Sequence, residues 1–140
     1  GKDQGGTNSL TVTGINDIYK RIVTVPSGGD TTIATFQTAV STSDAAMDLE
    51  SVKYIRVTNL DGTNSVNLSL QIAGGEDGSP NMSTTILLEA GKSFMLGTVH
   101  DGIAVDDDAA GIVTALTDLE SILVDSASNN VQLEVLIASA

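Results

Sequence analysis

Residues 65–73, SVNLSLQIA, alternate strictly between polar and apolar side chains. The apolar positions are Val66, Leu68, Leu70 and Ile72. In an extended strand successive side chains point to opposite faces, whereas a helix would spread these four residues around its axis. The segment therefore predicts a β-strand with one face in a core and the other in water.

Other segments of strand character recur through the chain with turn residues between them, at a spacing of roughly ten residues. The segments are residues 19–25, 31–36, 52–59, 65–73, 84–88, 93–98, 120–126 and 131–138. In the last one we expect Val131, Leu133, Val135 and Ile137 to face the core. This pattern predicts an all-β chain, a single β-sandwich or jelly roll of about eight antiparallel strands.

The chain shows no tandem repeat and no domain boundary, so residues 10–140 are predicted to form one β-sandwich domain. Residues 1–9, GKDQGGTNS, are Gly-rich and polar and predict a flexible N-terminal arm. This arm is either a plain disordered end or a segment that grips a neighbour. Regular structure is expected to begin near Leu10.

Three polar turns each separate two of the predicted strands, and we expect each turn to close a β-hairpin. The turns are Asp61-Gly62, residues 89–92 and residues 128–130. Gly91 is expected to supply a positive φ in the second of them. Residues 41–50 predict a loop or one short helical turn, with Ser43 as a candidate N-cap.

The charge distribution excludes several classes of partner. The chain carries a net charge of −12, and no Lys or Arg follows Lys92. A nucleic-acid backbone or an anionic membrane surface needs a basic footprint, so we expect neither nucleic acid nor membrane as a partner. No apolar run approaches the length of a membrane span.

The inventory of reactive side chains predicts that the protein is not an enzyme. The 140 residues contain no Cys and one His, His100. Asp101 is adjacent, but neighbouring residues of a strand point to opposite faces, so the pair does not suit a catalytic triad. With two Tyr, two Phe and no Trp, an aromatic-lined sugar cleft is hard to build. The Gly-rich pieces match no phosphate or dinucleotide motif, so we expect no catalytic residue and no cofactor.

Calcium is the best of the metal options, because hard carboxylate oxygens suit it. The candidate ligands are Asp101, Asp106, Asp107 and Asp108, and Glu76-Asp77 form a smaller acidic pair. Their spacing lacks the alternating ligands, central Gly and terminal Glu of an EF-hand loop. A solvated acidic loop explains the same residues, and we predict no metal site.

Four of the six basic residues fall in two predicted strands: Lys20, Arg21, Lys53 and Arg56. Together they predict a small basic patch that meets an acidic neighbour. The alternative interpretation is that these four residues only decorate the solvent face.

Three stretches of the sequence carry a resemblance to a known class of protein. They are VKYIRVTNLDGTNSVNLSLQI, TTILLEAGKSFML and the closing VQLEVLIASA. They resemble small β-sandwich virion structural proteins of tailed bacteriophages, of the capsid decoration or cement type. The shared style covers roughly residues 52–98 and 119–140 and carries over no catalytic residue.

The resemblance implies a role in binding and stabilising the outside of a capsid. It implies the major capsid protein as partner, the capsid exterior of the virion as location and a homo-oligomer, with a trimer favoured. Two alternatives stay open: a tail, neck or fibre component of a phage, and an extracellular glycan-binding or adhesin module.

Overall fold

The computed structural model describes residues 5–37, 46–72, 82–97, 99, 102–103, 105, 112–113 and 116–140, and these contain nine strands and one short 3-10 helix. The elements are β1 (Asp17–Val25), β2 (Asp30–Gln37), β3 (Met47–Asp48), η1 (Leu49–Ser51), β4 (Val52–Asn59), β5 (Val66–Ile72), β6 (Met82–Leu88), β7 (Ser93–Gly97), β8 (Leu119–Asp125) and β9 (Val131–Ser139). The protein is an all-β sandwich, and each of the eight predicted strands is present.

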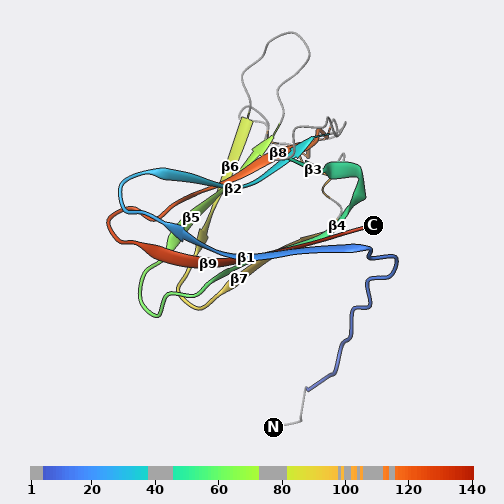
Figure 1. The fold of residues 1–140 in the computed structure, drawn as a ribbon, viewed down its shortest axis with the longest axis horizontal. Coiled ribbons are helices and arrows are strands. Elements are labelled where there is room, and N and C mark those ends of the chain that lie inside the picture. The colour runs from blue at the N-terminus through green and yellow to red at the C-terminus, as the bar shows by residue number, and fades with distance from the viewer. Residues whose placement is uncertain are drawn as a thin grey trace.

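The strands form two sheets that face each other (Figure 1). Sheet A has the order β1-β9-β4-β7 and sheet B has the order β3-β2-β8-β5-β6. Without the two-residue β3, this is the strand order of an eight-stranded jelly roll. Every pairing is antiparallel except the short one between β2 and β3.

The core lies between the two sheets and is almost entirely aliphatic. All eight residues predicted to face inward in β5 and β9 are buried, so the assignment of the two faces from the alternation is confirmed. Phe36 is the one aromatic residue among the buried core residues that the structure describes. Branched side chains fill a pleated interior well, which suits a chain with so few aromatics.

The three predicted hairpins are wrong. Each turn connects a strand of one sheet to a strand of the other: β4 to β5, β6 to β7 and β8 to β9. An alternating pattern shows which face of a strand is buried. It does not show whether the next strand pairs with it in the same sheet or faces it from the other sheet, because the alternation is the same in both cases. Gly91 has the expected positive φ, 69°. Gly62 does not have a positive φ, which a type I′ hairpin turn would require of it.

The turn between β4 and β5 is built by side chains. Asp61 Oδ1 accepts hydrogen bonds from the backbone N–H groups of Thr63 (2.8 Å) and Asn64 (2.7 Å). The bond from Asn64, followed by that from Thr63, lowers the pKa of the Asp61 carboxyl. Asn59, at the end of β4, is fully buried and donates to the carbonyl oxygens of Asn64 and Leu88. These bonds fix the point where the chain crosses between the sheets.

The predicted helical turn is present as η1, with a different cap. Asp48 Oδ1 accepts from Glu50 N at 3.1 Å, so Asp48 is the N-cap of this turn. Ser43 lies outside the described residues. The preceding β3 pairs only Met47 and Asp48 with the end of β2, and a strand of two residues leaves no periodic signal in the sequence.

Regular structure begins at Asp17 rather than near Leu10. Residues 5–14 have exposed side chains and belong to no strand, and Ile15 is half-buried. Asn16 N donates to Ser139 O at 2.9 Å and joins the start of β1 to the end of β9. From there the N-terminal segment runs away from the sandwich (Figure 1).

Candidate interaction surface

The outer face of sheet A is the most distinctive surface of the described chain. The strand register places its side chains in two central rows that cross all four strands. One row holds Lys20, Leu136, Arg56 and Met95, and the next holds Ile22, Glu134, Thr58 and Ser93. The rows mix charged, hydroxyl and apolar side chains that lie far apart in the sequence.

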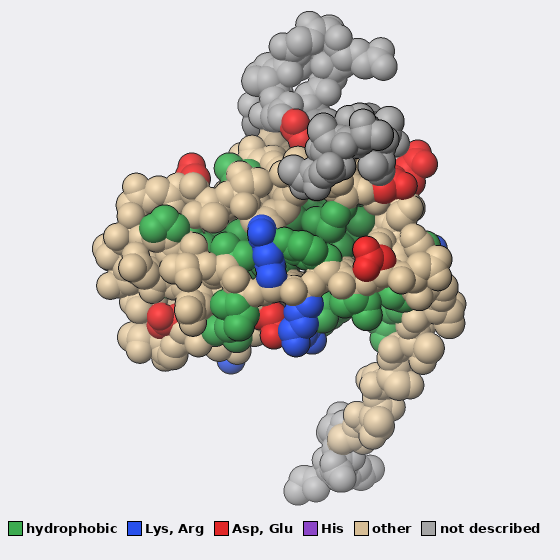
Figure 2. Space-filling model, in the orientation of Figure 1, with side chains coloured by type: hydrophobic (Ala, Val, Ile, Leu, Met, Phe, Trp, Pro, Cys, Tyr) green, Lys and Arg blue, Asp and Glu red, His purple; other side chains and the backbone are tan. Residues whose placement is uncertain are grey.

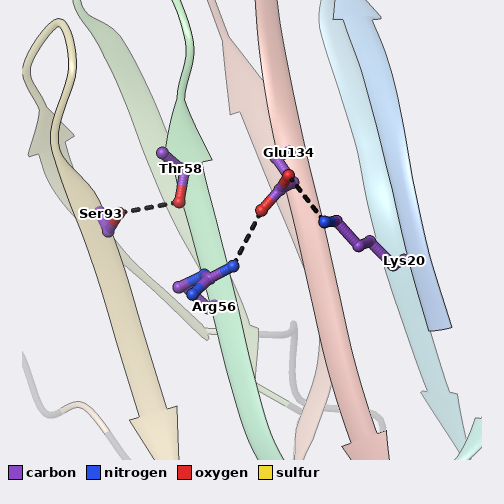
Figure 3. A network of polar contacts seen from close by, with 5 residues as sticks. All are labelled: Lys20, Arg56, Thr58, Ser93 and Glu134. Atoms are coloured by element: carbon purple, nitrogen blue, oxygen red, sulfur yellow. Dashed lines mark hydrogen bonds and ion pairs between the residues drawn. The ribbon is translucent and has the colours of Figure 1, made fainter. Parts of the chain in front are cut away.

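Glu134 lies at the centre of this face and binds two cations (Figure 3). Its Oε1 accepts from Arg56 Nη2 at 2.9 Å, and its Oε2 lies 3.3 Å from Lys20 Nζ. The hydrogen bond from Arg56, followed by that from Lys20, lowers the pKa of the Glu134 carboxyl. The network joins β1, β9 and β4 across the face and leaves one net positive charge.

A separate neutral hydrogen bond lies between this network and the β7 edge of the sheet. Thr58 Oγ1 and Ser93 Oγ lie 2.8 Å apart, one on β4 and the other on β7 (Figure 3). The ionic group thus links β1, β9 and β4 across the outer face, and the hydroxyl pair links β4 to β7. Side chains held in this way are ordered before a partner arrives, which lowers the entropic cost of binding.

Large apolar side chains flank the polar centre. Ile18, Ile22 and Met95 are each 61% exposed, and all three lie on the outer face of sheet A. Single exposed apolar residues are ordinary, but several on one face beside ordered polar groups are typical of protein contact surfaces.

The structure places the four residues of the predicted basic patch in three settings. Lys20 and Arg56 share Glu134 on the outer face. Arg21, next to Lys20, points to the other face, where its Nη2 donates to Ile33 O at 3.0 Å. Lys53 is exposed at the register shift between Val52 and Tyr54. The four residues therefore do not form one basic patch: only Lys20 and Arg56 come together, and the sequence had no signal for the role of Glu134 between them.

The outer face of sheet B carries a shallow polar depression of about 250 Å³. Its lining residues are Asp30, Asn67, Ser69, Gln71, Thr85, Leu123, Val124 and Asp125. These described lining residues include no aromatic ring. Amide and hydroxyl groups at this position can hydrogen-bond a polar ligand, but they offer no platform for a sugar ring.

The structure does not describe the predicted reactive and metal-ligating residues. His100, Asp101, Asp106, Asp107 and Asp108 lie outside the described residues, and so do Glu76 and Asp77. Within the described ranges no three His, Asp or Glu side chains gather as a metal site would require. The same part of the chain has no helix that is long and apolar enough to span a membrane.

Comparisons with known proteins add little to this geometry. No protein-family model and no curated protein matches the chain. One solved structure, from work titled "Bacillus endospore appendages form a novel family of disulfide-linked pili", aligns over 96% of this chain and 98% of its own. The TM-score is 0.42 and the sequence identity is 12%, so this likeness carries no argument about function.

Proposed function

We propose that this chain is a non-enzymatic structural protein of a virion, and that it binds the outside of a phage capsid through the outer face of sheet A. The observation that carries the proposal is the group of exposed apolar residues Ile18, Ile22 and Met95 around the network centred on Glu134. The partner is the major capsid protein, and binding stabilises the shell.

The face combines the two kinds of contact that a cementing protein needs. Burial of an exposed apolar side chain of this size contributes on the order of 1 kcal/mol, so three of them give a useful but modest affinity per copy. The cations of Lys20 and Arg56 favour an acidic surface on the partner. When many copies bind a regular shell, their modest contributions add up and stabilise the shell.

The rest of the molecule suits the same role. Its rigid aliphatic sandwich holds the face in one shape, and the net charge of −12 keeps the particle exterior hydrated and soluble. The resemblance of residues 52–98 and 119–140 to capsid decoration proteins supports the choice of the shell as partner.

The test is heat release of the packaged genome from particles with and without the protein. Particles that lack it should assemble and should release their genome at a lower temperature. The double variant Ile22→Glu with Met95→Glu should bind shells at least tenfold more weakly, because it puts two anions on the docking face. Thr32→Glu, which puts an anion at an exposed position on the outer face of sheet B, is the control.

Two results would exclude the proposal. Equal release temperatures with and without the protein would exclude cementing, and particles that never assemble without it would indicate a scaffolding role. Copy number separates the phage alternatives, because decoration proteins are present in hundreds of copies and tail, neck or fibre components in few.

The polar depression on sheet B supports one second candidate, a glycan-binding or adhesin module. Hydroxyl and amide groups from β5 and β6 converge there, beside the Asp125 carboxylate of β8. A glycan array tests this candidate: binding that Gln71→Ala and Asn67→Ala abolish would establish it. The absence of an aromatic platform among the described lining residues makes the shell-binding role the better-supported one.

A further inference from the structure

The two sides of the sandwich leave their strand edges in different states. One side carries β1 and β2, and the other carries β6 and β7. An exposed edge offers unpaired N–H and C=O groups to any passing strand, so soluble proteins usually block it with a bulge, a charge or a proline. Within the described part of the chain, such blocks are found on the side of β1 and β2 and are absent from β6.

The edges of β1 and β2 are blocked. Arg21 points inward from β1, stacks on Tyr19 at 5.2 Å and donates to Ile33 O on β2. The pairing of β2 shifts register between Thr32 and Ala34. An inward-pointing charge and an irregular strand both hinder the addition of another strand. Figure 2 shows a cationic side chain across the apolar opening on this side of the molecule.

The edge of β6 has none of these blocks. Its sequence, MSTTILL, contains no charge and no proline, and it pairs with β5 in unbroken register over all seven residues. No described strand pairs with its other side. Met82 and Ile86 face the core side of sheet B, opposite the buried Ile72 and Leu68, yet they are 38% and 37% exposed. The inner side of β6 is therefore only partly covered at Met82 and Ile86.

The N-terminal segment, residues 5–16, has the properties of a missing strand. Its sequence, GGTNSLTVTGIN, carries no charge and alternates Leu10 and Val12 with Thr11 and Thr13. Leu10 is 81% exposed and Val12 is 38% exposed. Added beside β6, residues 7–13 match its length, with Leu10 and Val12 on the partly covered inner side and the threonines in water.

The segment belongs to a second copy rather than to the same chain. It leaves the sandwich from the start of β1, and β1 and β6 lie on opposite sides of the molecule. Two copies repel each other overall, because each carries a charge of −12. Residues 5–16 and β6 are both uncharged, so their contact avoids that repulsion.

We propose that residues 7–13 of one copy add as a strand to the β6 edge of a second copy, and that this exchange builds the homo-oligomer. Main-chain hydrogen bonds give the affinity, and Leu10 and Val12 give the register. The interface is separate from the outer face of sheet A, so shell binding and self-assembly fail independently.

Analytical ultracentrifugation of the purified chain, with no shells present, tests the exchange. A variant without residues 1–13 has the acceptor edge but no donor. Ile86→Lys keeps the donor and gives β6 an inward-facing cation, as Arg21 does for β1. Each variant should be monomeric alone, and an equimolar mixture of the two should form a 1:1 dimer. Thr32→Lys, on the blocked side, should assemble like the intact chain.

Three results would overturn the proposal: an intact chain that is monomeric at all concentrations, a truncated chain that assembles like the intact one, and a mixture that gives no dimer. If Ile86→Lys does not fold, substitutions confined to the N-terminal segment still test the proposal. Leu10→Ser with Val12→Ser should lose assembly, whereas Thr11→Ser with Thr13→Ser should keep it.

Discussion

The outer faces of the two sheets differ although both are built on the same alternation. The outer face of sheet A has three apolar side chains, each 61% exposed, around an ordered ionic centre. The outer face of sheet B has amides and hydroxyls at most positions of β5 and β6, with Leu87 as its large exposed apolar residue. One surface is costly to leave in water and the other is not.

This difference distinguishes positions that serve folding from positions that are available for function on the same strands. Most inward positions of both sheets are aliphatic because the core needs them. Outward positions of sheet B are mostly polar, which keeps this face soluble. Ile18, Ile22 and Met95 on sheet A are apolar but contribute little to folding, because they remain largely hydrated. In the proposed function, these three side chains are the ones that the partner covers.

The largest expected effect tests the division between inner and outer positions. Leu70→Ala should lower the free energy of unfolding by about 2–5 kcal/mol, since Leu70 is 5% exposed and its removal leaves a cavity. Its neighbour Ser69→Ala, on the outer face, should change it by less than about 0.5 kcal/mol. Chemical denaturation measures both.

The same measurement should show that Ile22→Ala on sheet A behaves like Ser69→Ala and not like Leu70→Ala. Ile22 is apolar but exposed, so its truncation removes little buried area. Equal losses for Leu70→Ala and Ile22→Ala would mean that the outer face of sheet A is part of the fold's own stability.

An effect smaller than that of Leu70→Ala is expected at Asn59, a buried polar residue among mostly apolar neighbours. Its side chain is fully buried and satisfied: the amide donates to two carbonyls, and Oδ1 accepts from Asp61 N at 3.0 Å. Asn59→Ala leaves these groups unpaired and should cost about 1–3 kcal/mol. Asn64→Ala, in the same turn but less buried, is the control and should cost less. A neutral Asn59→Ala would show that water replaces the amide.

The sequence was sufficient to predict eight of the nine described strands and the buried faces of β5 and β9. Each strand's alternation is a local property, and burial of Val66 through Ile72 at every second position follows from it directly. The partner of each strand is not local. Asp61-Gly62 was expected to close a hairpin between two strands of one sheet. Whether the second strand joins that sheet or the opposite one depends on the packing energy of the whole core, and here the chain crosses to the other sheet.

The interaction surface was predictable only in part, for the same reason. Lys20 and Arg56 were recognisable as basic residues in strands, but the register of β1 and β4 on β9 brings Glu134 between them. That register pairs residues more than 70 positions apart. The opposite direction of Arg21 followed from strand geometry, whereas its bond to Ile33 O required the position of β2.

The smallest expected effect concerns acid stability and the ionic centre of sheet A. Because Arg56 and then Lys20 lower the pKa of Glu134 in the folded state, the unfolded chain takes up its proton first as the pH falls. The stabilisation is therefore complete above the unfolded pKa, near pH 4–5, and is lost as the pH falls through the folded value. Glu134→Gln removes this contribution, so its thermal midpoint should be slightly lower than that of the native chain at pH 7 and should approach it as the pH falls through the folded value.

Salt provides the control for this last prediction, since Glu134, Lys20 and Arg56 lie at the surface and are screened by ions. In about 1 M NaCl the difference between the native chain and Glu134→Gln at pH 7 should shrink. Thermal melts at pH 7, 5 and 3, with and without salt, measure both dependences. Parallel curves for the two proteins at every pH would mean that Glu134 does not stabilise the fold, and that its network serves only to present Lys20 and Arg56 to a partner.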